Sequence, residues 1–231
     1  MKVVLSCEHA VNNIPKVYQK FFINAQDILQ THRGYDLGAL ELFNTIKNNK
    51  VYYSQCATAS RLLVDINRSL YRRTLFSEFT KPLSKDDRRR ILDDYYYSFR
   101  LPFWEKVNDL WTQNVFVLHL SVHSFTPRLN GRERETDFGI LYHPGRPQEK
   151  LFAQLWKAEL RKALPDFRVR FNYPYQGKPD GHVRYFRDRE EKLYAGIEFE
   201  MNQKYAGDAV INAGIAEAFW RAYKEYKNNL G

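Results

Sequence analysis

The stretch Lys2-Val3-Val4-Leu5-Ser6-Cys7-Glu8-His9 is an aliphatic run that stops in three residues able to bind metal or transfer protons. Three consecutive aliphatic residues are typical of a strand buried on both faces, as in the parallel sheet of an α/β protein. Open α/β sheets bind their ligands just beyond the carboxyl ends of the strands. A functional site at Glu8-His9 is therefore one interpretation, and a capped strand with an exposed polar turn is the other.

The rest of the chain alternates between strand and helix patterns. The strongest strand pattern covers 114–122, which is expected at the centre of the sheet because it is apolar on both faces. Other strands are predicted at 51–53, 62–66, 138–142, 169–171, 183–186 and 195–200. Helices are predicted at about 34–48, 84–101 and 147–163, and from Asp208 to the C-terminus. Pro102 is expected to kink or restart the chain after the second of these. The alternation, without a repeat or linker, predicts one α/β domain over 1–231 with a largely parallel or mixed sheet.

Composition narrows the class of protein. A chain of 231 residues with 44% hydrophobic residues suits a single folded domain. Its two cysteines, Cys7 and Cys56, are too few for a disulfide framework and favour a reducing compartment. The sequence contains no apolar run of about 20 residues and does not begin like a signal peptide, so we expect a cytoplasmic protein that does not cross a membrane.

The formal net charge of +9 is compatible with nucleic acid, with an anionic substrate or with surface charge alone. Basic residues cluster at 72–73, 88–90 and 184–189, but acidic residues interrupt most of these runs. A solvated face of mixed charge is therefore the favoured explanation, and nucleic acid is not an expected partner.

Two predicted strands end in histidine, one at His9 and the central one at His123. If both strands are parallel, the two imidazoles emerge at one edge of the sheet. Two histidines and a carboxylate, with one open position, form a zinc site suited to hydrolysis. Asp36 is a candidate third ligand and Glu8 competes with it. The alternative is that each histidine is a hydrogen-bonded core residue.

Charged residues flank two further predicted strands. Arg61 and Arg68 lie on either side of 62–66, where their guanidinium groups can bind the carboxylate of an acidic substrate. Pairing between Asp65 and Arg68 is an equal alternative. Glu198 and Glu200 share one strand face, either as candidates for the general base of a metallohydrolase or as an exposed edge.

Several ordered motifs resemble the N-formylglutamate amidohydrolase family. The motifs are Ser6-Cys7-Glu8-His9-Ala10 with Ile14-Pro15, His32-Arg33-Gly34-Tyr35-Asp36-Leu37-Gly38-Ala39, Ser60-Arg61-Leu62-Leu63-Val64-Asp65-Ile66-Asn67-Arg68, His123-Ser124-Phe125-Thr126-Pro127 and Asn172-Tyr173-Pro174-Tyr175. The resemblance covers nearly the whole chain. It implies a fold like that of the zinc carboxypeptidases: a three-layer α/β/α domain of the phosphorylase/hydrolase-like kind with a mixed, largely parallel central sheet.

The resemblance also implies a zinc-dependent hydrolase of a linear amide. Its implied metal ligands are His9 and His123, with Asp36 as the third. Asn67 and Arg68 resemble the pair by which zinc carboxypeptidases hold a substrate carboxylate, and Ser124 and Arg132 are further substrate-binding candidates. The general base is Glu200 or Glu198, since Glu200-Met201-Asn202-Gln203 resembles the family's Glu-x-Asn-Arg with glutamine in place of arginine. Arg61 or His182 is the candidate donor to the oxyanion.

The expected substrate is an N-acylated acidic amino acid such as N-formylglutamate, or a related small anionic amide. The basic loop Arg128, Arg132 and Arg134 follows His123 and is compatible with a larger anionic substrate. The rival hypothesis is a basic module that binds nucleic acid or protein on a catalytically inactive hydrolase fold. The sequence gives no indication of the oligomeric state.

Overall fold

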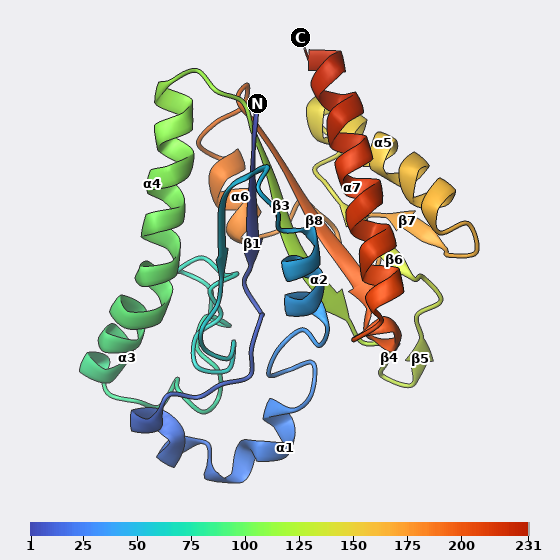
Figure 1. Ribbon diagram of the computed structural model, residues 1–231. Coiled ribbons are helices and arrows are strands. Elements are labelled where there is room, and N and C mark those ends of the chain that lie inside the picture. The colour runs from blue at the N-terminus through green and yellow to red at the C-terminus, as the bar shows by residue number, and fades with distance from the viewer. Residues whose placement is uncertain (231) are drawn as a thin grey trace.

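The computed structural model describes residues 1–230, which form a mixed six-stranded sheet with helices on both faces (Figure 1). The strand order is β2-β1-β3-β8-β6-β7. The parallel part comprises β1 (Lys2–Cys7), β2 (Val51–Cys56), β3 (Val117–Phe125) and β8 (Tyr194–Asn202). Against β8, β6 (Phe138–Leu141) runs antiparallel, and β7 (Val169–Phe171) is parallel to β6. The α/β class and the mixed, largely parallel sheet are confirmed.

The two faces of the sheet carry separate hydrophobic cores. On one face lie α2 (Ala39–Ile46), α5 (Pro147–Ala163) and α7 (Ala209–Leu230). The other face packs against α4 (Ser98–Thr112) and the short α6 (His182–Arg187). None of the helices among residues 1–230 has the length and apolar character needed to cross a membrane.

The central strand β3 is buried throughout, but its two faces differ in chemistry. Leu118, Leu120 and Val122 belong to the core under α2, α5 and α7. The alternate residues of β3, beginning with Val117, face α4 and α6, where the His119 ring packs on Phe103 and Phe186. This face of the sheet therefore becomes polar toward the carboxyl end of the strand.

Two predicted strands are wrong. Residues 62–66 contain turns joined by irregular backbone; Leu63 N donates to Ser60 O, and Asp65 N donates to Leu75 O. Their apolar side chains are buried all the same, so burial rather than strand pairing explains the apolar run. Residues 183–186 lie in α6, because Val183 and Phe186 are spaced three apart and pack together on the sheet.

The predicted helix 84–101 is longer than expected. Ser84 caps α3 (Lys85–Ile91) by accepting a hydrogen bond from Asp87 N, and a π-helical segment (Leu92–Tyr97) leads directly into α4. Pro102 lies inside α4 and does not end it. Gln55 Nε2 donates to Ser98 O at 3.2 Å, the carbonyl whose helical donor would be the N–H that proline lacks.

The remaining elements are short. They are the 3₁₀ turns Lys16–Phe21, Ile23–Ala25 and Gln203–Tyr205, the helix α1 (Gln26–Leu29) and the hairpin of β4 (Arg128–Leu129) and β5 (Arg132–Glu133).

Candidate metal centre and substrate cavity

A cavity of about 480 Å³ opens beyond the carboxyl ends of β1 and β3. Its lining contains three groups of predicted site residues: His9, Asp36 and His123; Arg61, Asn67, Arg68 and Ser124; and Glu198 and Glu200. Most of the residues proposed from sequence are thus brought to one cavity, although they come from segments far apart in the chain.

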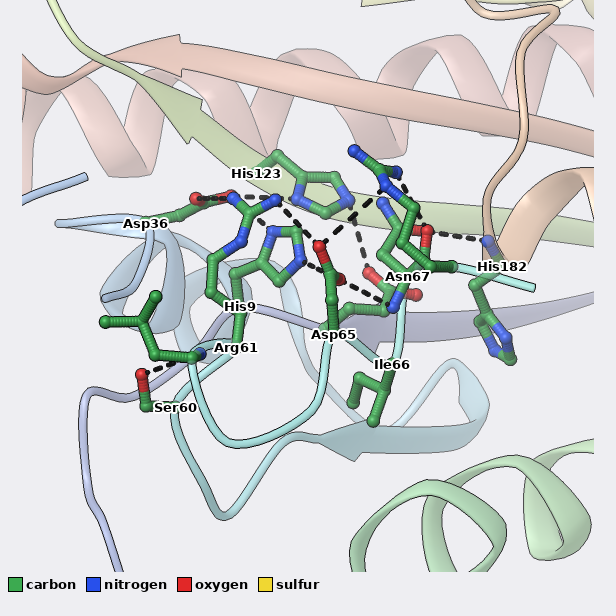
Figure 2. A network of polar contacts seen from close by, with 12 residues as sticks. His9, Asp36, Ser60, Arg61, Asp65, Ile66, Asn67, His123 and His182 are labelled. Atoms are coloured by element: carbon green, nitrogen blue, oxygen red, sulfur yellow. Dashed lines mark hydrogen bonds and ion pairs between the residues drawn. The ribbon is translucent and has the colours of Figure 1, made fainter. Parts of the chain in front are cut away.

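His9, Asp36 and His123 converge at the base of this cavity (Figure 2). The Nδ1 atoms of the two histidines lie 3.3 Å and 2.8 Å from the same oxygen, Asp36 Oδ2. Each residue offers one ligand atom, and these atoms all lie within 4.8 Å of one another. Two imidazoles and a carboxylate that open onto a cavity are the donor set of a catalytic zinc site. The residues present therefore fit a zinc ion.

Both imidazoles are held from behind by carboxylates. His9 Nε2 lies 2.8 Å from Asp65 Oδ1, while His123 Nε2 lies 2.8 Å from Ser121 Oγ and 3.2 Å from Glu8 Oε2. A carboxylate behind a histidine fixes the orientation of the ring and makes its other nitrogen a better ligand. Glu8, a competitor for the third ligand position, is fully buried and reaches His123 from the side opposite Asp36.

The electrostatics of the centre favour a cation. Burial raises the pKa of Asp65, but Arg61 and His9 outweigh it and hold the pKa well below its ordinary value. For Asp36, burial is likewise outweighed by His9 and His123, so its pKa is lowered. Burial lowers the pKa of His123, yet Asp36 and Glu8 raise it well above its ordinary value. Ionised carboxylates around two imidazoles stabilise a positive charge at this place.

Glu200 and Glu198 project from β8 into the cavity. Glu200 pairs in register with His123. This pair lies two residues nearer the carboxyl ends of the strands than the pair of Glu198 and Ser121. Burial raises the pKa of Glu200 to about 8, with His123 opposing and Asp36 adding to the shift. Glu200 Oε2 is buried and has no hydrogen-bond partner among the described residues. Burial also raises the pKa of Glu198.

The two arginines occupy different environments. Arg61 lies 3.0 Å from Asp65 Oδ2 and 3.6 Å from Asp36 Oδ1, so carboxylates of the centre hold it in place. Arg68 lies 3.9 Å from Asp65, donates to Asn67 O at 2.9 Å and keeps about a third of its side chain exposed. The Asp65–Arg68 pairing considered from spacing is therefore a long contact. Nη1 of Arg68 also donates to Asp180 O at 3.4 Å, and Nη2 has no hydrogen bond among the described residues.

Two predicted residues do not line the cavity. The His182 ring is fully buried among Phe99, Phe103 and Phe186, and only its backbone approaches the site, with N donating to Asn67 Oδ1 at 2.6 Å. Arg132 lies exposed on β5. Ser124 does line the cavity, where its hydroxyl donates to Leu37 O.

Sequence reasoning missed the role of one loop. Residues 172–181 pass over β6 and place Tyr175, Gln176 and Asp180 in the cavity wall. A side chain at Gly139 would meet Tyr173 O at 2.1 Å, so the loop can lie on β6 only where the strand has glycine.

Asp65 was also missed as the partner of His9. A charged residue within an apolar run was the available signal for Asp65, whereas no local pattern indicates the path of the loop.

Comparisons with known proteins show the family and the fold. A sequence model of the N-formylglutamate amidohydrolase family matches residues 1–206. The gene product Atu2144 from Agrobacterium tumefaciens superposes with a TM-score of 0.80 at 23% identity, covering 99% of this chain and 91% of that one. An N-formylglutamate amidohydrolase from Ralstonia eutropha JMP134 superposes with a TM-score of 0.72 at 16% identity, covering 99% and 95%. At these identities the two structures show the fold. A search of curated proteins gave no match.

Proposed function

Because the chain belongs to the N-formylglutamate amidohydrolase family, we propose that it is a zinc-dependent enzyme that hydrolyses the amide of an N-acyl amino acid. N-formylglutamate is the first substrate to test, and a related small anionic amide is the wider class. The observation that carries the proposal is the convergence of His9 Nδ1, His123 Nδ1 and Asp36 Oδ2 at the base of the cavity.

His9, Asp36 and His123 would hold the zinc ion. When bound there, zinc would supply a Lewis acid that polarises the amide carbonyl and makes water a nucleophile near neutral pH. Hydrogen bonds from Nε2 of the two imidazoles to Asp65 and Glu8 would leave each Nδ1 as the ligand atom that faces the cavity.

Glu200 is the favoured general base because it lies in register with His123 and has an unpartnered oxygen. Burial in the protein disfavours the ionised form of Glu200, and a positive charge at the centre would favour it. Glu200 then takes a proton from the attacking water and delivers it to the leaving amine. The acyl C–N bond breaks, and the products are a carboxylic acid and a free amino acid. Glu198 is the second candidate for this role.

Arg68 would bind the carboxylate of the substrate through its planar fork, with Asn67 beside it. Arg61, held over the centre by Asp65 and Asp36, is the supported donor to the oxyanion. His182 is a weaker candidate for that role because its ring does not line the cavity. The free cysteines, Cys7 and Cys56, are compatible with the cytoplasmic location expected from sequence.

Metal analysis and hydrolysis assays on the purified protein test the proposal. We expect about one equivalent of zinc, which is lost in His123→Ala and kept in His143→Ala, a matched variant outside the cavity. N-formyl-L-glutamate, N-acetyl-L-glutamate and N-succinyl-L-glutamate identify the acyl group. A protein that takes up no zinc and hydrolyses none of these amides would contradict the proposal.

A further inference from the structure

A second cavity, of about 360 Å³, lies between the π-helical segment, the start of α4 and α6. Asp180 lines both this cavity and the substrate cavity. The walls of the second cavity are largely apolar and aromatic, formed by Leu70, Tyr71, Tyr97, Leu101 and Tyr185. Leu70, Tyr71 and Leu101 are 48%, 74% and 51% exposed, so an apolar surface is open to solvent here.

Arg100 lines this cavity although it is only 5% exposed, and its guanidinium packs against two aromatic rings of the cavity wall. It lies 4.8 Å from the centre of the Tyr96 ring and 5.3 Å from that of Tyr185. Its Nε and Nη2 donate to backbone carbonyls, at 2.9–3.1 Å to Ile66 O and 3.2 Å to Arg68 O. Within residues 1–230, no hydrogen bond involves Nη1 and no carboxylate lies within 4.0 Å of the group. A buried cation without a counter-ion is costly, and an anion in the cavity would relieve this cost.

The other charged groups around the cavity are largely engaged. Asp180 accepts hydrogen bonds from Ser69 N and Oγ and lies 3.2 Å from Arg72 Nε. Arg184 pairs with Asp188 at 3.2 Å. Arg189 stacks on the Tyr185 ring at 3.4 Å and adds a further positive charge to the rim. The cavity therefore attracts one negative charge, while its two aspartates disfavour a doubly charged group such as phosphate.

We propose that this cavity binds a small monocarboxylate with an aromatic or aliphatic body. The carboxylate pairs with Arg100 Nη1, and the body packs against Tyr97, Leu101 and Tyr185. The ligand acts on the neighbouring substrate cavity, because Arg100 holds the carbonyls of Ile66 and Arg68 on either side of Asn67. Tyr96, in the same wall, donates its hydroxyl hydrogen bond to Arg68 O at 2.9 Å.

Isothermal titration with 3-phenylpropionate tests binding without any need for activity. We expect saturable one-site binding, and binding of the neutral 3-phenylpropionamide at least ~10-fold weaker, the typical effect of a charge-assisted hydrogen bond. Leu101→Glu adds a negative charge to an exposed wall position and should weaken binding of the acid by at least ~10-fold. Leu101→Gln, the matched neutral variant, should keep binding to within about 3-fold.

Arg68→Ala separates the two cavities. Binding of 3-phenylpropionate should survive this change, because only the backbone carbonyl of Arg68 contacts Arg100. Equal binding of acid and amide, no binding at all, or binding lost in Arg68→Ala each overturns the proposal.

The effect on the substrate cavity rests on the proposed function, and a ligand-dependent change in KM tests it. An unchanged KM at saturating 3-phenylpropionate would overturn the coupling and leave the binding site in place. Binding without any amidase activity would instead show that the proposed function fails while the anion site stands.

Discussion

Asp65 Oδ1 lies 2.8 Å from His9 Nε2, across the imidazole ring from the nitrogen that contacts Asp36. Asp65→Asn keeps the shape of this contact but removes the charge that would make His9 a better zinc ligand. We expect zinc affinity to fall by about 10–100-fold, measured by competition with a chromogenic chelator. Asp166→Asn, at an exposed position, is the control and should change nothing. Unchanged affinity in Asp65→Asn would contradict this role of Asp65.

Replacement of Glu200 by glutamine should separate metal binding from catalysis. Glu200→Gln removes the proposed base and leaves His9, Asp36 and His123 in place. We expect kcat to fall by about 10²–10⁴-fold while the zinc content stays the same. Glu198→Gln is the matched variant and should have the smaller effect. A larger loss in Glu198→Gln would transfer the role to that residue.

Glu200 also gives the metal-free protein a pH-dependent stability. Its pKa is about 8 when folded, against an ordinary value of 4.5, so the folded state binds this proton more tightly than the unfolded state. The contribution of Glu200 to stability therefore falls as the pH rises from about 4.5 to about 8 and is constant above that. In urea unfolding with chelator present, the free energy of unfolding of Glu200→Gln should increase relative to that of the parent protein as the pH rises from 5 to 9. A difference that does not vary with pH would exclude the raised pKa.

Arg68 should determine affinity for the substrate carboxylate more than the rate of the chemical step. Arg68→Ala is expected to raise KM by about 10–100-fold, because a hydrogen-bonded charge pair is worth about 1.5–3 kcal/mol. Arg68→Lys keeps the charge but loses the planar fork, so its KM should lie between those of the parent protein and Arg68→Ala. Steady-state kinetics check this: the three proteins should have similar KM values for a substrate in which that carboxylate is replaced by an amide. If the difference persists, Arg68 does not contact that group.

A buried ion pair ties α5 and α6 to β8. Arg187 Nε lies 2.7 Å from Glu149 Oε1, which also accepts the Gly196 N–H at 3.1 Å. Arg187→Ala leaves the Glu149 charge buried without a partner, so we expect a loss of about 3–5 kcal/mol in urea unfolding. Arg221→Ala breaks the exposed pair with Glu217 and should cost less than about 1 kcal/mol. Equal losses in the two variants would be inconsistent with this account.

The parallel core of the sheet was predictable because aliphatic runs such as Val3-Val4-Leu5 are typical of strands that are buried on both faces. Once β1 and β3 are known to be parallel, His9 and His123 must emerge at one edge. The apolar run at 62–66 failed as a strand because buried turns and buried strands have the same local composition. The contact of Asp65 with His9 depends on the path of that turn, which follows from tertiary packing rather than local pattern.

The path of the loop at 172–181 was unpredictable for a similar reason. It depends on the close approach of Tyr173 to Gly139, two residues that belong to different segments of the chain. An isolated glycine in a strand pattern indicates that another segment approaches closely, but not which segment it is.

The antiparallel direction of β6 has a consequence for how members of such a family can diverge. The chain leaves the sheet at the end of β3 and re-enters it at the start of β6, and both points lie at the carboxyl edge of β8. The hairpin between them can therefore be lengthened, shortened or exchanged without shifting the register of any strand. Within this segment Thr126 lines the cavity, so an exchanged hairpin would reach the cavity wall while every strand stays in place.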